Sequence, residues 1–312
     1  MVDASLGISV ILPVYKPLLS FRDLLNALSE QQVSVPYEVI IVDDCSPLEV
    51  YEEYSNYAAS PRSHVFQVSR MKSNQGPALV RNFAVSKARG EVLVLIDADC
   101  VLSDPCHLEK LWQAHCKQPD ALIGGGINGV GRGYVAFCDH FCHWATNIPF
   151  QQKGPISKGH LAAAHLLIQR TIWDKIGPFD PLRTGEDTIF CLRAQQRGVT
   201  LYLRGDIVLN HHDRQELRNF LNTFFEVGKD RKKTRQIAYG NAPWFLKAPP
   251  LVQFFFSFSD CDRINTGSSS ELVASRQAHH LGPAWNIFGY AGYWIWCVCG
   301  PVFEKLANEF LG

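Results

Sequence analysis

Short apolar runs alternate with amphipathic segments through the first hundred residues of the chain. Runs rich in β-branched residues predict four strands, at 8–14, 38–42, 64–68 and 92–96. Their nearly continuous apolar character is typical of parallel strands that are covered on both faces. Between them, apolar residues at helical spacing predict helices that begin at Phe21 and cover 50–59 and 77–88. This order predicts an α/β fold, a Rossmann-like and mostly parallel central sheet with helices on both faces.

The pattern is less regular after residue 100, where we expect the same domain to continue. Helices are predicted from about residue 103 to His115, at 186–197 and at 214–233. Shorter apolar runs predict strands at 121–123, 162–168, 200–203 and 207–209, and a glycine-dense turn is predicted at 124–129. Prolines and a polar loop weaken the pattern beyond about Tyr239. We therefore predict one large domain over 1–238, divided near residue 120, and a helical, apolar C-terminal extension over 239–312.

Composition and charge exclude several classes of protein. The 312 residues are 46% hydrophobic and 19% charged, so the chain lacks the composition of a disordered protein. Thirty Lys and Arg balance thirty Asp and Glu, which gives a formal net charge of zero and disfavours a nucleic-acid partner. The ten cysteines are scattered, and no signal peptide is recognised before the first predicted strand. We therefore expect free thiols and a cytoplasmic location.

The C-terminal extension contains twenty consecutive positions without a charged residue, 284–303. This length reaches that of a membrane span, but glycines, a proline and clustered aromatic residues fit a clean span poorly. Two interpretations stay open: the stretch docks at a membrane interface through its Trp and Tyr side chains, or it packs as a buried tail on the domain. The first would place the protein on the cytoplasmic face of a membrane, where the basic run at 229–235 could bind anionic headgroups instead of forming a solvated surface.

Acidic residues follow two of the predicted strands at the point where each strand ends. Asp43 and Asp44 follow the second strand, and Asp97 and Asp99 follow the fourth. Ligands of such sheets bind at the carboxyl ends of the strands, so these side chains are expected near one site. Asp97 and Asp99 could share one Mg²⁺ or Mn²⁺ ion, or one could bind the ion while the other holds a sugar or ribose hydroxyl. Asp43 and Asp44 could bind a base or ribose, or, with Ser46, cap the helix that follows.

Two candidates for catalysis lie in the second half of the domain. Thr184 and the acids at 186–187 have the pattern of a capping box, which leaves Asp187 in the first helical turn, where the helix dipole favours an ionised carboxylate. Such a carboxylate beside a cleft could act as a general base, so a cap alone and a cap that is also a base both stay open. His211 or His212 could complete an Asp/His metal site. Adjacent residues of a strand point to opposite faces, so at most one of them would bind the metal.

Two further motifs do not support the function that they first suggest. Residues 124–129 fit the pattern GxGxxG, but no convincing helix follows and no acidic residue lies about twenty positions on, so a dinucleotide site is not predicted. Cys138, His140, Cys142 and His143 are dense enough to suggest zinc. Their spacing matches no usual paired scheme, and a zinc site is not predicted either.

Several short segments together resemble the motifs of a family 2 glycosyltransferase of the GT-A fold. They are ISVILPVY at 8–15, VDDCS at 42–46, NQGPA at 74–78 followed by Arg81 and Asn82, DAD at 97–99, IQR at 168–170, IGPFD at 176–180, and ED at 186–187 followed by Arg193. The resemblance covers roughly residues 8–212. Each motif is weak alone, but their order and spacing are specific.

On the donor side, the resemblance implies that residues 1–120 form a nucleotide-sugar half, with a UDP-sugar as the favoured donor. The residues implied to bind this donor are Pro13, Val14, Tyr15, Asp43, Asp44, Asn74, Gly76, Arg81 and Asp97. Asp99 would bind a Mg²⁺ or Mn²⁺ ion on the diphosphate, with Asp97 and His211 as further metal-site residues. Lys16 stands where the opening motif usually has Asn, which leaves the donor sugar open.

On the other side, the resemblance implies that residues 121–238 form an acceptor half. Asp187 would remove the proton of the acceptor hydroxyl, and Glu186 and His165 would lie on the acceptor side. His165 replaces the Asn that the family usually has there, so the acceptor, a carbohydrate or a lipid-linked molecule, also stays open.

The implied activity is a metal-dependent transfer of a sugar from a nucleoside diphosphate to a hydroxyl, in polysaccharide or glycolipid assembly. One base and no covalent nucleophile predict inversion at the anomeric carbon. Two alternatives are a nucleotide-sugar binding protein without catalysis and a sugar-phosphate nucleotidyltransferase. The latter would carry a glycine-rich, basic loop after the first strand, whereas residues 13–20 contain no glycine and Lys16 as their one basic residue.

Overall fold

The structure, a computed structural model, describes residues 6–59, 65–144, 153–156, 160–223 and 237. These residues belong to one compact unit, Met1–Ala238. Residues 217–223 of the helix predicted at 214–233 are helical. The basic run at 229–235 and the extension over 239–312, with its apolar stretch, lie outside the described residues, so the domain boundary stays a prediction. In the part of the chain that is described, no helix is long and apolar enough to cross a membrane.

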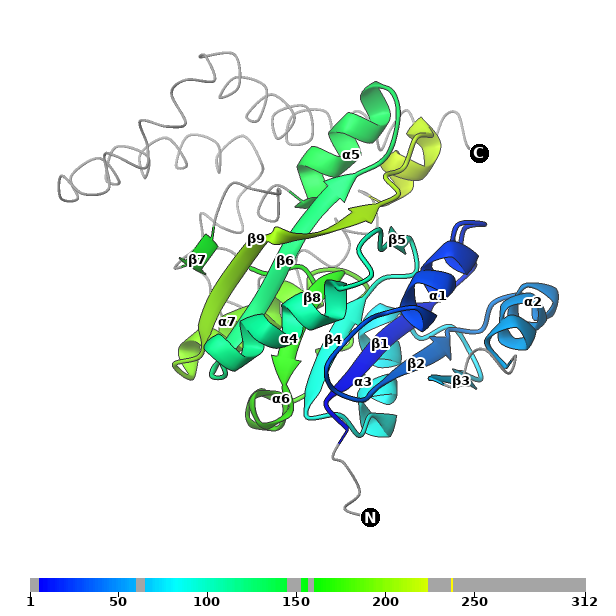
Figure 1. Ribbon diagram of the computed structural model, residues 1–312. Coiled ribbons are helices and arrows are strands. Elements are labelled where there is room, and N and C mark those ends of the chain that lie inside the picture. The colour runs from blue at the N-terminus through cyan, green and yellow to red at the C-terminus, as the bar shows by residue number, and fades with distance from the viewer. Residues whose placement is uncertain (1–5, 60–64, 145–152, 157–159, 224–236, 238–312) are drawn as a thin grey trace, which may run out of the picture. The chain divides into compact units, whose positions relative to one another are not determined.

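Strands and helices alternate up to the fourth strand and less regularly beyond it (Figure 1). The strands are β1 (Ile8–Val14), β2 (Tyr37–Asp43), β3 (Phe66–Arg70), β4 (Val92–Ile96), β5 (Cys100–Val101), β6 (Ala121–Gly129), β7 (Lys153–Ile156), β8 (His165–Gln169) and β9 (Thr200–His211). The helices are α1 (Phe21–Ser29), α2 (Leu48–Ala58), α3 (Pro77–Lys87), α4 (His107–Lys117), α5 (Tyr134–Trp144), α6 (Arg170–Ile176) and α7 (Glu186–Gln196).

All the described strands join one mixed sheet with the order β3-β2-β1-β4-β8-β6-β9-β5, and β7 also pairs with β9. The four strands of the N-terminal part of the chain, β1 to β4, are neighbours in the sheet and pair in parallel, as the sequence predicts. β8 lies antiparallel to both β4 and β6, while β6 and β9 run parallel to each other. The carboxyl ends of β1, β2, β4, β6 and β9 therefore lie at one edge of the sheet.

Two hydrophobic layers cover the sheet, one on each face. On one face, Phe21, Leu24, Leu25 and Leu28 of α1 pack with apolar residues of α2 and α4. On the other face, residues of α3, α6 and α7 pack together with Ile11 and Leu95. The alternation along β1 explains both layers, because Val10 and Leu12 belong to the first and Ile11 to the second. Burial on both faces accounts for the continuous apolar strands, and the predicted arrangement of helices is confirmed.

Two predictions about the second half of the domain are wrong. The glycine-dense segment at 124–129 is not a turn, because β6 continues through it to Gly129. A Cβ atom at Gly125 would lie 1.9 Å from the His165 ring, so glycine leaves room there for a large buried neighbour. The apolar runs at 200–203 and 207–209 belong to a single strand, β9. The register between β6 and β9 shifts between Gly125 and Gly126, and this irregularity accommodates the polar residues between the two runs.

Candidate active site

The turn after β2 is built around the buried carboxylate of Asp43. Its Oδ1 accepts a hydrogen bond from the Tyr54 hydroxyl at 2.7 Å, and its Oδ2 accepts one from the Ser46 amide at 2.9 Å and lies 3.3 Å from Arg70 Nε. The Ser46 hydroxyl accepts a hydrogen bond from the Lys16 amide instead of capping α2, whose N-cap is Pro47. Asp43 therefore organises the turn from within, which differs from the predicted direct contact with a donor.

Asp44 joins three of the sequence motifs into one unit. Its amide donates to the Val14 carbonyl at 2.7 Å, and its carboxylate accepts hydrogen bonds from the Gln75 and Gly76 amides at 2.6 and 2.8 Å. Gly76 has a φ of 84° and precedes α3, so its amide belongs to the N-terminus of that helix, where a carboxylate is stabilised. Tyr15, directly after β1, is 47% exposed, so its ring is open to a ligand.

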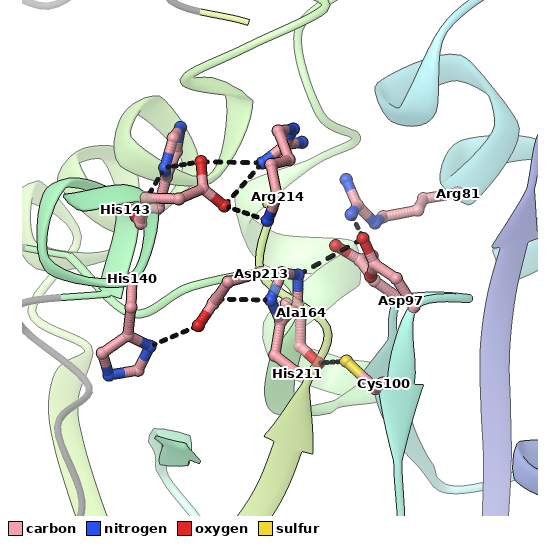
Figure 2. A network of polar contacts seen from close by, with 11 residues as sticks. Arg81, Asp97, Cys100, His140, His143, Ala164, His211, Asp213 and Arg214 are labelled. Atoms are coloured by element: carbon pink, nitrogen blue, oxygen red, sulfur yellow. Dashed lines mark hydrogen bonds and ion pairs between the residues drawn. The ribbon is translucent and has the colours of Figure 1, made fainter. Parts of the chain in front are cut away.

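Arg81 of α3 lies between Asp97 and Glu186, and Figure 2 shows its contact with Asp97. Its side chain is 4% exposed, with Nη2 2.5 Å from Asp97 Oδ1 and Nη1 2.6 Å from Glu186 Oε1. Burial opposes the charge, but the two carboxylates more than offset it, so the pKa of Arg81 is raised. The guanidinium of Arg81 thus joins the two acids, and its contact with the nucleotide sugar stays a prediction.

Glu186 and Asp187 begin α7, as predicted. The N-cap of α7 is Gly185, at φ 78°, one position after the predicted capping residue, Thr184. Burial and the neighbouring Asp187 outweigh the attraction of Arg81 and raise the pKa of Glu186 to about 7. Asp187 Oδ2 accepts a hydrogen bond from the Ala163 amide at 3.2 Å, and its Oδ1 accepts one from the Thr188 amide at 2.7 Å. Backbone amides thus fix the carboxylate that is predicted to act as the base.

The segment that leads to α7 is tied to α3 by further contacts. The Asn82 carboxamide donates to the Phe179 carbonyl and accepts from the Phe179 amide, both at 2.9 Å. Arg183 donates to the Asn74 side chain at 2.8 Å, and Asn74 in turn donates to the Asp44 carbonyl at 3.2 Å. These bonds join the donor and acceptor halves of the predicted site. No contact between Asn82 or Arg183 and its partner was predicted, because the paired residues are about a hundred positions apart in the sequence.

His211, at the end of β9, approaches the second acid of the Asp97-Ala98-Asp99 motif. Its Nε2 lies 3.3 Å from Asp99 Oδ2, and the strand pair places Cys100 opposite His211. Burial opposes protonation of His211, but Asp99 and Asp213 outweigh it and raise its pKa to about 10. Burial also opposes ionisation of Asp99, but the His211 imidazolium holds the pKa of Asp99 below its ordinary value. Of the two candidate histidines, His211 is therefore the one beside the predicted metal site.

The donor set at this point fits a divalent cation that also binds a diphosphate. Among the described residues, no group of three His, Cys, Asp or Glu side chains could by itself hold a metal ion. Mg²⁺ and Mn²⁺ sites on nucleotides use one or two carboxylates and complete their coordination with phosphate oxygens. Asp99 and His211 would supply the protein ligands, whereas Asp97 Oδ1 is already bound to Arg81. This arrangement favours the alternative in which Asp99 holds the ion and Asp97 has another role.

His165 lies inside the domain and not at its surface. Its Nδ1 is 3.0 Å from the Gly126 carbonyl oxygen and its Nε2 is 3.0 Å from His107 Nε2, and the two rings stack. Burial lowers the pKa of His165 to about 4, so the ring is neutral at neutral pH. His165 was predicted to lie beside the acceptor, but it is a buried residue of β8 that pairs with Ile96, the last residue of β4.

The histidines that suggested zinc are part of a polar network beside His211 (Figure 2). His140 Nδ1 lies 3.5 Å from Asp213 Oδ2, and His143 Nδ1 lies 3.2 Å from Asp139 Oδ1. Asp213 was not predicted as a site residue, although it stands two positions after His211, where a strand-like spacing would place both side chains on one face. That spacing was the available signal.

Comparison with known proteins relates the chain to glycosyltransferases. Residues 9–158 match the family described as glycosyl transferase family 2. The chain is 26% identical over 258 residues to glycosyltransferase AglE of Haloferax volcanii, which covers 78% of this chain and 82% of that protein. It is 35% identical over 96 residues to poly(ribitol-phosphate) beta-N-acetylglucosaminyltransferase TarS of Staphylococcus aureus, which covers 29% of this chain but 16% of TarS.

Two solved structures share the fold. TarS residues 1–349 in complex with UDP-GlcNAc gives a TM-score of 0.53 at 20% identity, covering 75% of this chain and 70% of that one. Mannosyltransferase PcManGT from Pyrobaculum calidifontis, in complex with GDP-Man and Mn²⁺, gives 0.59 at 16% identity, covering 99% and 90%. At such identities the likeness concerns the fold, and it confirms the predicted GT-A type of sheet domain.

Proposed function

This chain belongs to glycosyl transferase family 2, and on that basis we propose that it moves a sugar from a nucleoside-diphosphate sugar to an acceptor hydroxyl, with inversion at the anomeric carbon. The observation that carries this proposal is the position of Arg81, which contacts Asp97 at 2.5 Å and Glu186 at 2.6 Å. The buried side chain of Arg81 thus connects Asp97, on the proposed donor side, to Glu186, which precedes the proposed base Asp187. As an enzyme of this family the chain is a glycosyltransferase, so the two alternative functions are set aside.

For the donor, we propose a UDP-sugar that binds along the ends of β1 and β2. The exposed ring of Tyr15 offers a surface for the base, and the turn held by Asp44 offers backbone and side-chain polar groups for the ribose. The complex of TarS with UDP-GlcNAc supports a UDP-sugar, and that of PcManGT with GDP-Man supports a nucleotide sugar as the class of donor. Asp97 would hold a ribose or sugar hydroxyl through Oδ2, since Oδ1 is bound to Arg81.

For the metal, we propose a Mg²⁺ or Mn²⁺ ion at Asp99 and His211. When bound there, the ion would neutralise the negative charge that develops on the leaving nucleoside diphosphate. The Mn²⁺ in the PcManGT complex supports this choice of cation.

For the base, we propose Asp187. Its carboxylate is held by the Ala163 and Thr188 amides and retains acceptor capacity for the hydroxyl proton of an incoming acceptor. A single base, with no covalent intermediate, gives in-line attack and an inverted product. The acceptor we propose is a carbohydrate or a lipid-linked molecule, in polysaccharide or glycolipid assembly. The similarity to TarS, a poly(ribitol-phosphate) beta-N-acetylglucosaminyltransferase, supports a polymer acceptor.

The experiment that tests this function is a screen of nucleotide sugars with Mg²⁺ or Mn²⁺, read by release of nucleoside diphosphate. Asp187→Asn should lower the rate of transfer by at least about 100-fold, as expected for loss of a general base, and should leave nucleotide affinity unchanged. Asp174→Asn, at an exposed position on α6, is the matched control and should behave as wild type. Loss of nucleotide binding in Asp187→Asn, or a product that keeps the donor's anomeric configuration, would contradict the proposal.

For location, we propose the cytoplasm, with peripheral contact at the cytoplasmic face of a membrane. The apolar and aromatic stretch at 284–303 and the basic run at 229–235 support this contact. Flotation of the full chain with vesicles that contain anionic lipid should recover the protein with the vesicles. Recovery in the unbound fraction would reject the membrane contact and leave the transferase proposal intact.

A further inference from the structure

The His211 side chain is oriented by a second carboxylate, on the side of the ring away from Asp99. His211 Nδ1 lies 3.1 Å from Asp213 Oδ1, while His211 Nε2 faces Asp99 Oδ2 at 3.3 Å (Figure 2). The two side chains are almost completely buried, with 3% of His211 and 2% of Asp213 exposed. A buried ring with one nitrogen on a carboxylate cannot rotate without breaking that bond, so Nε2 stays directed at Asp99.

Asp213 is itself fixed by residues from two other elements. Its Oδ2 lies 3.5 Å from His140 Nδ1 of α5, and a Cβ atom on Gly129 of β6 would lie 1.9 Å from the same oxygen. Only a residue without a side chain at Gly129 leaves space for this carboxylate. The next residue, Arg214, donates its amide to Asp139 at 2.9 Å and its guanidinium to the same carboxylate at 3.2 Å. The chain around Asp213 is therefore held in place independently of His211.

This geometry has a known chemical use. A histidine that ligates a metal almost always donates its other ring N–H to a carboxylate or carbonyl, which fixes the tautomer and the ring orientation and makes the free nitrogen a better ligand. We infer that Asp213 is a positioning residue that directs His211 Nε2 toward a divalent cation shared with Asp99 and the donor diphosphate. This inference rests on the metal site of the proposed function, and it adds the residue that makes His211 a competent ligand.

The test measures metal binding and does not depend on turnover. The full-length protein, with UDP present, is titrated with Mn²⁺, and free Mn²⁺ is followed by electron paramagnetic resonance. Asp213→Ala should weaken Mn²⁺ affinity by about 10- to 100-fold, the loss typical of removing such a partner. Asp213→Asn keeps an oxygen that can accept from Nδ1, so its loss should be smaller than that of the alanine variant. Asp206→Asn is the matched control, because Asp206 lies on β9, the strand that ends at His211, and pairs with Arg204 at 2.9 Å.

The possible results distinguish the role of Asp213 from the proposed metal site itself. A wild-type protein that binds Mn²⁺ with UDP, together with an Asp213→Ala variant of equal affinity, overturns the role of Asp213 and leaves the proposed metal site standing. A wild-type protein that does not bind Mn²⁺ with UDP overturns both. For Asp213→Asn, both the affinity for UDP in the absence of metal and the midpoint of urea unfolding should stay close to the wild-type values. An Asp213→Asn variant that is folded and yet weaker for Mn²⁺, with unchanged metal-free UDP binding, supports a positioning role over a merely structural one.

Discussion

Removal of the Arg81 guanidinium should destabilise the domain, because two acids would lose their buried partner. Arg81→Met keeps a long side chain but leaves Glu186, 7% exposed, and Asp97, 26% exposed, without the cation between them. Breaking a buried ion pair by removing one partner costs about 3–5 kcal/mol. Water can reach Asp97 in part, so we expect the lower end of this range, about 3 kcal/mol, or roughly a hundredfold change in the ratio of folded to unfolded protein.

The loss in Arg81→Met should depend on pH. In the wild type, Glu186 titrates at about pH 7 because burial and Asp187 outweigh Arg81, and without Arg81 its pKa should rise further. At pH 6, Glu186 is mostly protonated in both proteins, so little is lost at that carboxyl. At pH 9, Glu186 of the wild type is ionised and paired with Arg81. In the variant, Glu186 is either ionised without a partner or protonated, and both states are unfavourable at this pH. The destabilisation measured by urea unfolding should therefore be larger at pH 9 than at pH 6.

A double-mutant cycle gives the decisive measurement. Glu186→Gln removes the charge that Arg81→Met leaves unpaired, so the double variant should be more stable than the sum of the two single losses implies, by about 0.5–3 kcal/mol at pH 9. Losses that add within about 0.5 kcal/mol, or an Arg81→Met loss that is equal at the two pH values, would refute the argument that Arg81 neutralises Glu186.

Three further predictions follow from contacts around the site. Burial lowers the pKa of His165 to about 4, whereas the unfolded chain binds this proton near pH 6.5, so the wild type loses stability as the pH falls from 6.5 toward 4. Between pH 8 and pH 5, the free energy of unfolding of His165→Asn should therefore fall by about 2 kcal/mol less than that of the wild type, as measured in urea, and equal losses would contradict this. Asn82→Ala removes both hydrogen bonds to Phe179 and should lower the transfer rate roughly 10- to 100-fold with unchanged nucleotide affinity, so a change in affinity with no change in rate would argue against it. Gly125→Ala places a Cβ atom 1.9 Å from the His165 ring and should cost about 1–3 kcal/mol, and an unchanged thermal midpoint would show that the ring moves freely.

The elements of the first half could be predicted because each signal is local. The apolar stripe of α1 and the β-branched runs of β1, β2 and β4 appear in the sequence at the spacing of one helix face or of strands covered on both faces. The second half was less predictable because the residues that decide its structure are distant in sequence. Gly124 and Gly125 resemble a turn until Leu161 and His165 are seen to fill the space above them.

The site was predictable only as far as strand ends could be found. Asp44, Asp97 and Asp99 were identified because each lies within three residues of the end of an apolar run, and His211 because it lies just after another. The contacts that give these residues their roles were not visible, since nothing in a linear pattern shows that Arg81 reaches Glu186 or that Asp43 is enclosed by Tyr54 and Arg70. A strand end locates a functional region, whereas tertiary contacts determine which acid is structural and which is free to bind a ligand.

The reversed strand β8 explains how residues of both halves reach one edge of the sheet. β4 ends at Ile96, and antiparallel pairing places the first residue of β8, His165, directly beside it. The chain that enters β8 therefore lies at the same edge as the acids after β4, and from there the Ala163 amide holds Asp187. A parallel strand at this position would bring its carboxyl end to the edge and carry residue 163 to the far side of the sheet. The relative position of the proposed base and the acids after β4 is thus set by strand pairing inside one sheet, which is a more rigid constraint than a loop could provide.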